Sequence, residues 1–154
     1  MTESPEPRDD ASGSMSASRA GYRWPDLTGT HVVLIEDNDD TRVMVKETLQ
    51  YCGALVATHS SADDALAQLT ELVPDVLICD LSMPGLDGLE FMLRLRARRP
   101  EQGGRVPAIA ITAYYEDFAA AAALEVGFDA YMTKPIKLEA LATLVRELAS
   151  TRSR

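Results

Sequence analysis

The stretch VLICDLSMPGLDGLEF, residues 76–91, decides how the chain folds. It begins as an apolar run that suits a buried β-strand, and the strand ends on one carboxylate, Asp80. A proline and two glycines follow within eight residues and turn the chain into a segment with helical periodicity. A buried strand that ends on an acid raises the question of what that carboxylate does.

The rest of the chain repeats this alternation of a short apolar strand and an amphipathic helix. We expect strands at residues 30–37, 54–60, 75–80, 108–112 and 129–133. We expect helices at about residues 39–52, 61–73, 88–99, 116–126 and from 138 onward, with Asp39 or Asp40 capping the first and Ser61 the second. Strands that are apolar on both faces, each followed by a crossover helix, predict an α/β fold with a five-stranded parallel sheet covered by helices on both faces.

Composition indicates how the chain is divided into domains. Residues 1–26 are rich in Ser, Pro, Glu and Asp, so we expect a disordered arm there and one folded domain over residues 27–151. Only four residues, TRSR, follow the last apolar stripe, which predicts no output domain. The initial Met1 favours a stand-alone protein, and a module cut from a larger sensor kinase is the alternative.

Charge and missing motifs exclude several function classes. The net charge of −9 argues against broad nucleic-acid binding, and no apolar run approaches the length of a membrane span. The N-terminus lacks the apolar core of a secretory signal, and two cysteines, Cys52 and Cys79, make no disulfide framework. We therefore expect a cytoplasmic protein. His31 and His59 have no ligand-like spacing, so a zinc site is not indicated.

Polar residues gather at the carboxyl ends of the predicted strands. Glu36 and Asp37 end the first strand, Asp80 the third and Thr112 the fourth, while Lys134 follows the fifth. In a parallel sheet all these ends lie on one rim, where open α/β sheets bind their ligands. Three carboxylates close together repel, and a divalent cation relieves that repulsion. Oxygen ligands without histidine or cysteine favour Mg²⁺, beside which Asp80 is a candidate carboxylate nucleophile for a phosphoryl group.

Four motifs, LIEDN, LICDLSMPGLDG, AIAITA and YMTKP, together resemble those of response-regulator receiver domains. The spacings of 43, 32 and 22 residues between Asp37, Asp80, Thr112 and Lys134 also resemble the family's, and the similarity covers about residues 30–150. The resemblance implies a flavodoxin-like (βα)5 fold with strand order 2-1-3-4-5. It also implies a phosphoacceptor in two-component signalling that is not a turnover enzyme.

The resemblance assigns roles to the rim residues. It makes Asp80 the phosphoacceptor, and it gives the Mg²⁺ site to Glu36, Asp37, Asp80 and the backbone carbonyl of Ser82. Lys134 is expected to pair with the phosphoryl oxygens as a point charge. The resemblance also implies a cis peptide bond between Lys134 and Pro135.

The resemblance also assigns residues to the switch and to the lifetime of the phosphoryl group. The Thr112 hydroxyl is expected to bond the phosphoryl group, and Tyr131 is either the aromatic residue that moves with it or a simple core residue. Ser82 and Tyr114 flank the approach of the hydrolytic water, so they are expected to tune hydrolysis. Ser82 is too short to position water well, and a bulky Tyr114 favours shielding over positioning.

Partners are implied by the same resemblance. The phosphoryl donor is expected to be a histidine kinase or a histidine phosphotransfer protein. Output is expected through a protein that contacts the fourth helix, fifth strand and fifth helix, or through a homodimer, with no nucleic acid or membrane involved. Two alternatives remain at this point: a receiver module of a hybrid histidine kinase, and a pseudo-receiver that binds its partner without phosphorylation.

Overall fold

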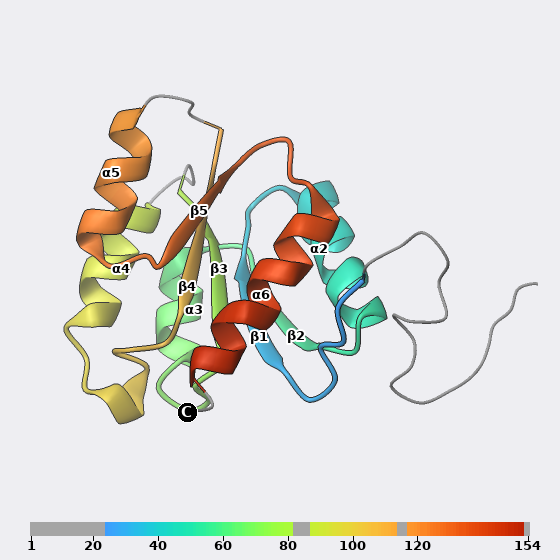
Figure 1. The fold of residues 1–154 in the computed structure, drawn as a ribbon. Coiled ribbons are helices and arrows are strands. Elements are labelled where there is room, and N and C mark those ends of the chain that lie inside the picture. The colour runs from blue at the N-terminus through green and yellow to red at the C-terminus, as the bar shows by residue number, and fades with distance from the viewer. Residues whose placement is uncertain (1–23, 82–86, 114–116, 153–154) are drawn as a thin grey trace, which may run out of the picture.

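The fold is one parallel sheet, seen in a computed structural model that describes residues 24–81, 87–113 and 117–152 (Figure 1). The strand order is β2-β1-β3-β4-β5, and every neighbouring pair runs parallel. The strands are β1 (His31–Ile35), β2 (Leu55–His59), β3 (Val76–Asp80), β4 (Ala108–Thr112) and β5 (Ala130–Thr133). The predicted fold class and strand order are confirmed.

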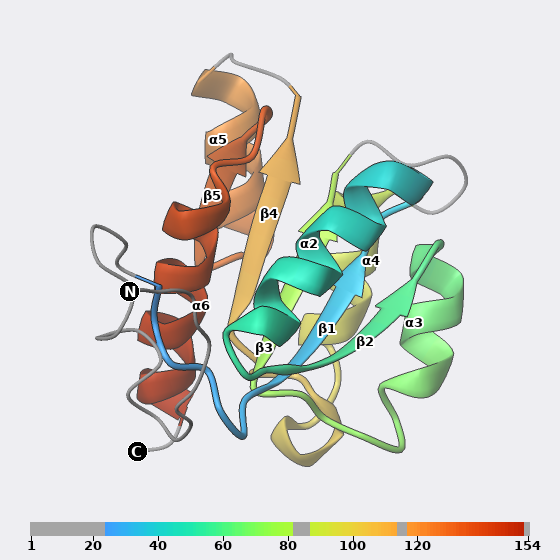
Figure 2. The ribbon, with the colours of Figure 1, turned by 90° about the vertical axis from the view of Figure 1, so that its right-hand side faces the viewer.

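Helices cover both faces of the sheet. They are α2 (Asp39–Tyr51), α3 (Ala62–Gln68), α4 (Gly88–Arg96), α5 (Asp117–Val126) and α6 (Leu138–Arg152), with a short 3₁₀ turn, η2 (Pro100–Gln102). Helices α2 and α6 lie on one face, and α3, α4 and α5 lie on the other (Figure 1, Figure 2). Across the described residues, no helix combines the length and the apolar character needed to cross a bilayer.

Two apolar cores result, one beneath each helical layer. Successive side chains of a strand point to opposite faces, so Val33 and Ile35 pack in the core under α3, α4 and α5. Val32 and Leu34 pack in the core under α2 and α6. This division explains why the strands lack the apolar–polar alternation of a half-exposed sheet.

Helix ends differ from the sequence-based prediction in three places, one of which is α4, which ends at Arg96 instead of residue 99. Asn38, rather than Asp39 or Asp40, caps α2, and its side chain accepts a hydrogen bond from the backbone nitrogen of Thr41 at 2.8 Å. The second helix, which Ser61 caps as predicted, ends at Gln68 instead of continuing to residue 73. The apolar spacing continues to Leu72, but that residue is 58% exposed.

The segment before β1 belongs to the folded part of the chain from at least Trp24. Pro25 and Leu27 are buried, and the Leu27 nitrogen donates to the Cys52 carbonyl at 2.8 Å. The Trp24 ring meets the Tyr51 ring edge-on, with centroids 6.3 Å apart. Trp24 and Leu27 therefore add to the core beneath α2.

Candidate functional site

The predicted rim residues meet at the carboxyl end of the sheet. Asp80 ends β3 and Thr112 ends β4, and these two strands are hydrogen-bonded neighbours. Glu36 directly follows β1 on the other side of β3, and Lys134 directly follows β5. The Lys134 backbone nitrogen donates to the Thr112 carbonyl at 2.8 Å, which extends the β4–β5 pairing up to the site.

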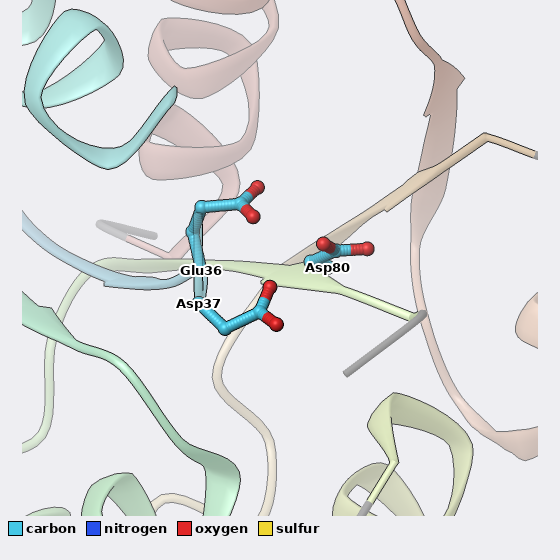
Figure 3. A group of neighbouring side chains, drawn as sticks. All are labelled: Glu36, Asp37 and Asp80. Carbon is cyan, nitrogen blue, oxygen red and sulfur yellow. The ribbon is translucent and has the colours of Figure 1, made fainter. Parts of the chain in front are cut away.

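Three carboxylates form the centre of the site. Each of Glu36, Asp37 and Asp80 offers an oxygen, and these oxygens lie within 4.8 Å of one another (Figure 3). Glu36 and Asp80 are buried, with 2% and 3% of their surface exposed, while Asp37 is more accessible. The carboxylates of Asp37 and Asp80 face the same space from the ends of adjacent strands (Figure 3). The structure thus brings together the acids that the sequence placed on one rim.

Lys134 links two of these acids. Its ammonium nitrogen lies 3.2 Å from Asp80 Oδ2 and 3.4 Å from Glu36 Oε1. Burial lowers the pKa of Lys134, but the charges of Asp80 and Glu36 outweigh burial and raise that pKa above its usual value. Lys134 is therefore a fixed positive charge between two buried acids. The Lys134–Pro135 bond is cis, as expected.

Glu36 holds a proton more strongly than an ordinary glutamate. Burial raises the pKa of its carboxyl to about 7, and the nearby Asp80 charge adds to the rise. A hydrogen bond from the Asn38 nitrogen to Glu36 Oε2, at 3.1 Å, acts in the opposite direction. Near neutral pH the site therefore lies close to the point where Glu36 gains or loses its charge.

The elements around Asp80 pack closely on its backbone. Helix α4 begins at Gly88, where an added Cβ would lie 2.9 Å from the Asp80 carbonyl oxygen and 2.8 Å from the Leu81 side chain. Asp87 caps α4 by accepting from the Glu90 nitrogen at 2.9 Å. Gly88, one of the two glycines that the sequence assigns to the turn after Asp80, allows α4 to approach the carboxyl end of β3.

The remaining predicted residues divide into those that the structure places and those that it does not describe. Thr112 is buried beside the acids, with 1% exposed. Tyr131 is 44% exposed, which excludes the alternative that it is a core residue. Ser82 and Tyr114 lie outside the described residues.

The donor set fits a magnesium ion. Mg²⁺ prefers oxygen ligands and keeps several waters, so one or two carboxylates suffice to bind it. Glu36, Asp37 and Asp80 supply oxygens only, and no histidine or cysteine joins this cluster in the part of the chain that the structure describes. The accessible Asp37 leaves the cluster open on one side, as a partly hydrated ion requires.

The class of protein follows from this fold and site. Residues 32–146 match the family described as the response regulator receiver domain, and the chain belongs to that family. Receiver domains are signalling modules that accept a phosphoryl group from histidine kinases, and they are not turnover enzymes.

Individual relatives agree with this assignment. An uncharacterized 14.6 kDa protein of Leptolyngbya boryana is 36% identical over 79% of this chain and 91% of its own length. The transcriptional regulatory protein AfsQ1 of Streptomyces coelicolor is also 36% identical, over 75% of this chain, but the match spans only 49% of that regulator.

One solved structure bears on the metal. The receiver domain of sensor histidine kinase PA1611 from Pseudomonas aeruginosa PAO1 was solved with a magnesium ion coordinated in its active site cleft. It aligns with a TM-score of 0.73 and 27% identity, over 80% of this chain and 99% of that one. The acidic cluster described above is of the kind typical of a Mg²⁺-binding receiver site.

Proposed function

We propose that this protein is a phosphorelay receiver in which Asp80 accepts a phosphoryl group, with Mg²⁺, from a histidine kinase or a histidine phosphotransfer protein of the cytoplasm. One observation carries the proposal. The Asp80 carboxylate is buried at the end of a strand, within 4.8 Å of two further acids, with a lysine ammonium 3.2 Å away. Such a carboxylate is held in one orientation for a nucleophilic attack.

In this transfer Asp80 acts as the nucleophile. One Asp80 oxygen forms a bond to phosphorus, the phosphorus–nitrogen bond of the donor histidine breaks, and its electron pair stays on the imidazole. Lys134 lies where its charge can hold the incoming phosphoryl oxygens next to Asp80. Bound by Glu36, Asp37, Asp80 and the Ser82 carbonyl, Mg²⁺ would neutralise negative charge on those oxygens.

The phosphorylation signal would leave the site through Thr112 at the end of β4 and Tyr131 in β5. Thr112, buried beside Asp80, would bond the phosphoryl group, and the exposed Tyr131 would then move toward the space that Thr112 vacates. These movements change the surface of α5, β5 and α6, where a shallow hollow is lined in part by Met132, Lys137 and Leu144. We assign this hollow to the output partner, with a second copy of the chain as the alternative occupant.

Intact-mass measurement tests the proposal. The protein is incubated with acetyl phosphate and MgCl₂, and its mass is expected to rise by one phosphoryl group, with no gain in EDTA. Asp80→Asn is expected to abolish the gain. Asp63→Asn, the same change at an exposed position in the first turn of α3, is the matched control and is expected to label like the wild type. Equal labelling of Asp80→Asn would contradict the assignment.

A further inference from the structure

Arg42 in α2 reaches back to the acidic cluster. Its Nη1 donates to the backbone carbonyl of Glu36 at 2.9 Å, and its Nη2 donates to the Asp39 carboxylate at 2.6 Å. The Arg42 side chain is only 21% exposed, while that of Asp39 is 84% exposed. A mostly buried guanidinium that bonds a main-chain carbonyl of the site is more than a surface ion pair.

The bonded carbonyl belongs to the peptide that joins Glu36 to Asp37. Because a peptide group is planar, fixing its carbonyl also fixes the direction of the Asp37 nitrogen. The preceding peptide is fixed as well, since the Glu36 nitrogen donates to the His59 carbonyl of β2 at 3.0 Å. The next one along is held through the Asn38 nitrogen, which donates to the Glu36 side chain at 3.1 Å.

These contacts place Asp37 between two hydrogen-bonded peptide groups, one held by Arg42 and the other by the Glu36 side chain. Asp37 is the most accessible of the three acids. We infer that Arg42 is a positioning residue for the metal site: by holding the Glu36–Asp37 peptide, it keeps the Asp37 carboxylate within reach of Glu36 and Asp80. The inference rests on the Mg²⁺-dependent function proposed above.

Charge and position predict opposite effects on Mg²⁺ binding. The Arg42 guanidinium is positive and lies next to the cluster, so by charge alone its removal would strengthen the binding of a cation. If Arg42 positions Asp37, its removal weakens binding instead. Lysine keeps the charge but lacks the planar fork that bonds two acceptors at once, so Arg42→Lys separates the two effects.

A role limited to helix stability must also be distinguished. Asp39 and Arg42 are three residues apart on α2, and such pairs stabilise a helix slightly. Asp39→Asn removes this ion pair but leaves the bond to the Glu36 carbonyl. Arg94→Met removes another ion pair within one helix, the exposed pair of Arg94 with Glu90 on α4.

The experiment titrates MgCl₂ into the full chain by isothermal calorimetry at constant ionic strength. Arg42→Met and Arg42→Lys are each expected to weaken Mg²⁺ binding about tenfold, the lower end of the range for losing a second-sphere contact. Asp39→Asn is expected to have a smaller effect, and Arg94→Met none. Phosphorylation of the Arg42 variants by acetyl phosphate is expected to need more Mg²⁺ but to reach the wild-type rate at saturation.

Thermal unfolding in EDTA accompanies the titration, so that a change in stability is not mistaken for a change in affinity. Tighter Mg²⁺ binding by Arg42→Met would show that the guanidinium acts by charge alone. Unchanged Mg²⁺ affinity in both variants would limit the role of Arg42 to stabilising helix α2. Either result overturns the inference. If Arg42→Met does not fold, Arg42→Lys still decides between the outcomes. A wild-type protein that binds no Mg²⁺ would instead overturn the proposed function itself.

Discussion

Two regions of the molecule are held by different forces. One is the junction between β1 and α2, and the other is the face formed by β5 and α6. At the junction, hydrogen bonds from Asn38 and Arg42 fix the position of Glu36. On the β5–α6 face, Tyr131 is 44% exposed, and Met132 and Leu144 are only partly buried against the core. One region is held by directional polar contacts, and the other by apolar packing that is incomplete.

This difference matches what each region is proposed to do. A metal and phosphoryl site needs one geometry, which directional hydrogen bonds provide. A signalling surface needs two packings of similar free energy, which non-directional apolar contacts allow. Lys134 connects the two regions, because it follows β5 in the chain while its ammonium group lies between Glu36 and Asp80.

The largest effect is expected from breaking that connection. Lys134→Met removes the positive charge next to Asp80, and phosphorylation by acetyl phosphate is expected to slow by about 10²-fold, as for loss of one charge-stabilising donor. Lys137→Met, an exposed lysine three residues further on, is the matched control and is expected to keep the wild-type rate. Rates are read from the time course of the intact mass. A Lys134→Met variant that labels as fast as Lys137→Met would separate the two regions and refute the role of Lys134.

Within the polar region, the acids are expected to differ in their contribution to Mg²⁺ binding. Asp37→Asn should weaken binding by more than about tenfold, and Glu36→Gln by less. The reason is that Asp37 is the expected direct ligand of the ion. Calorimetric titration with MgCl₂ measures both. An unchanged affinity in Asp37→Asn would count against the predicted ligand set.

The raised pKa of Glu36 predicts how Mg²⁺ binding depends on pH. A proton on Glu36 competes with the cation, so affinity should increase as the pH rises through 7, by up to about tenfold between pH 6 and pH 8. In the ion-free protein the sign is the reverse: ionising Glu36 costs more in the folded state, so its contribution to stability falls between about pH 4.5 and pH 7. Glu36→Gln should flatten both profiles, and a variant that keeps the wild-type slopes would assign them to another group.

The smallest effect concerns the lifetime of the phosphoryl group. The sequence predicts that Tyr114 shields phospho-Asp80 from water, so Tyr114→Ala should speed its loss a few-fold, roughly the size of a lost steric contact. Loss is followed by intact mass after the donor is removed. Slower loss in Tyr114→Ala would show that the tyrosine positions water instead.

The sequence predicted the sheet and the rim well, for a physical reason. Strands buried on both faces give continuous apolar runs, and the carboxyl ends of parallel strands share one edge, so Asp80, Thr112 and Lys134 could be placed together without coordinates. Helix ends were less predictable. Asn38, Asp39 and Asp40 are all able to cap a helix, and only the backbone geometry selects Asn38.

Contacts made to main-chain carbonyl groups could not be predicted from the sequence. Nothing in the sequence pattern links the Arg42 guanidinium to the Glu36 carbonyl, because a main-chain acceptor leaves no residue-type signal. Gly88 was indicated only as a turn residue, although a side chain there would meet the Asp80 carbonyl. Both features follow from how α2 and α4 pack against the strand ends, which periodicity alone does not determine.

The central claim is that a phosphoryl group on Asp80, held in the polar region, changes the packing of the apolar one. Amide NMR spectra of the full chain, recorded with MgCl₂ before and after addition of acetyl phosphate, test it most directly. We predict shifts at Asp37 and Lys134 together with shifts at Tyr131 and Leu144, all absent in Asp80→Asn. Shifts confined to the acidic cluster, with Tyr131 and Leu144 unchanged in the phosphorylated protein, would contradict the account.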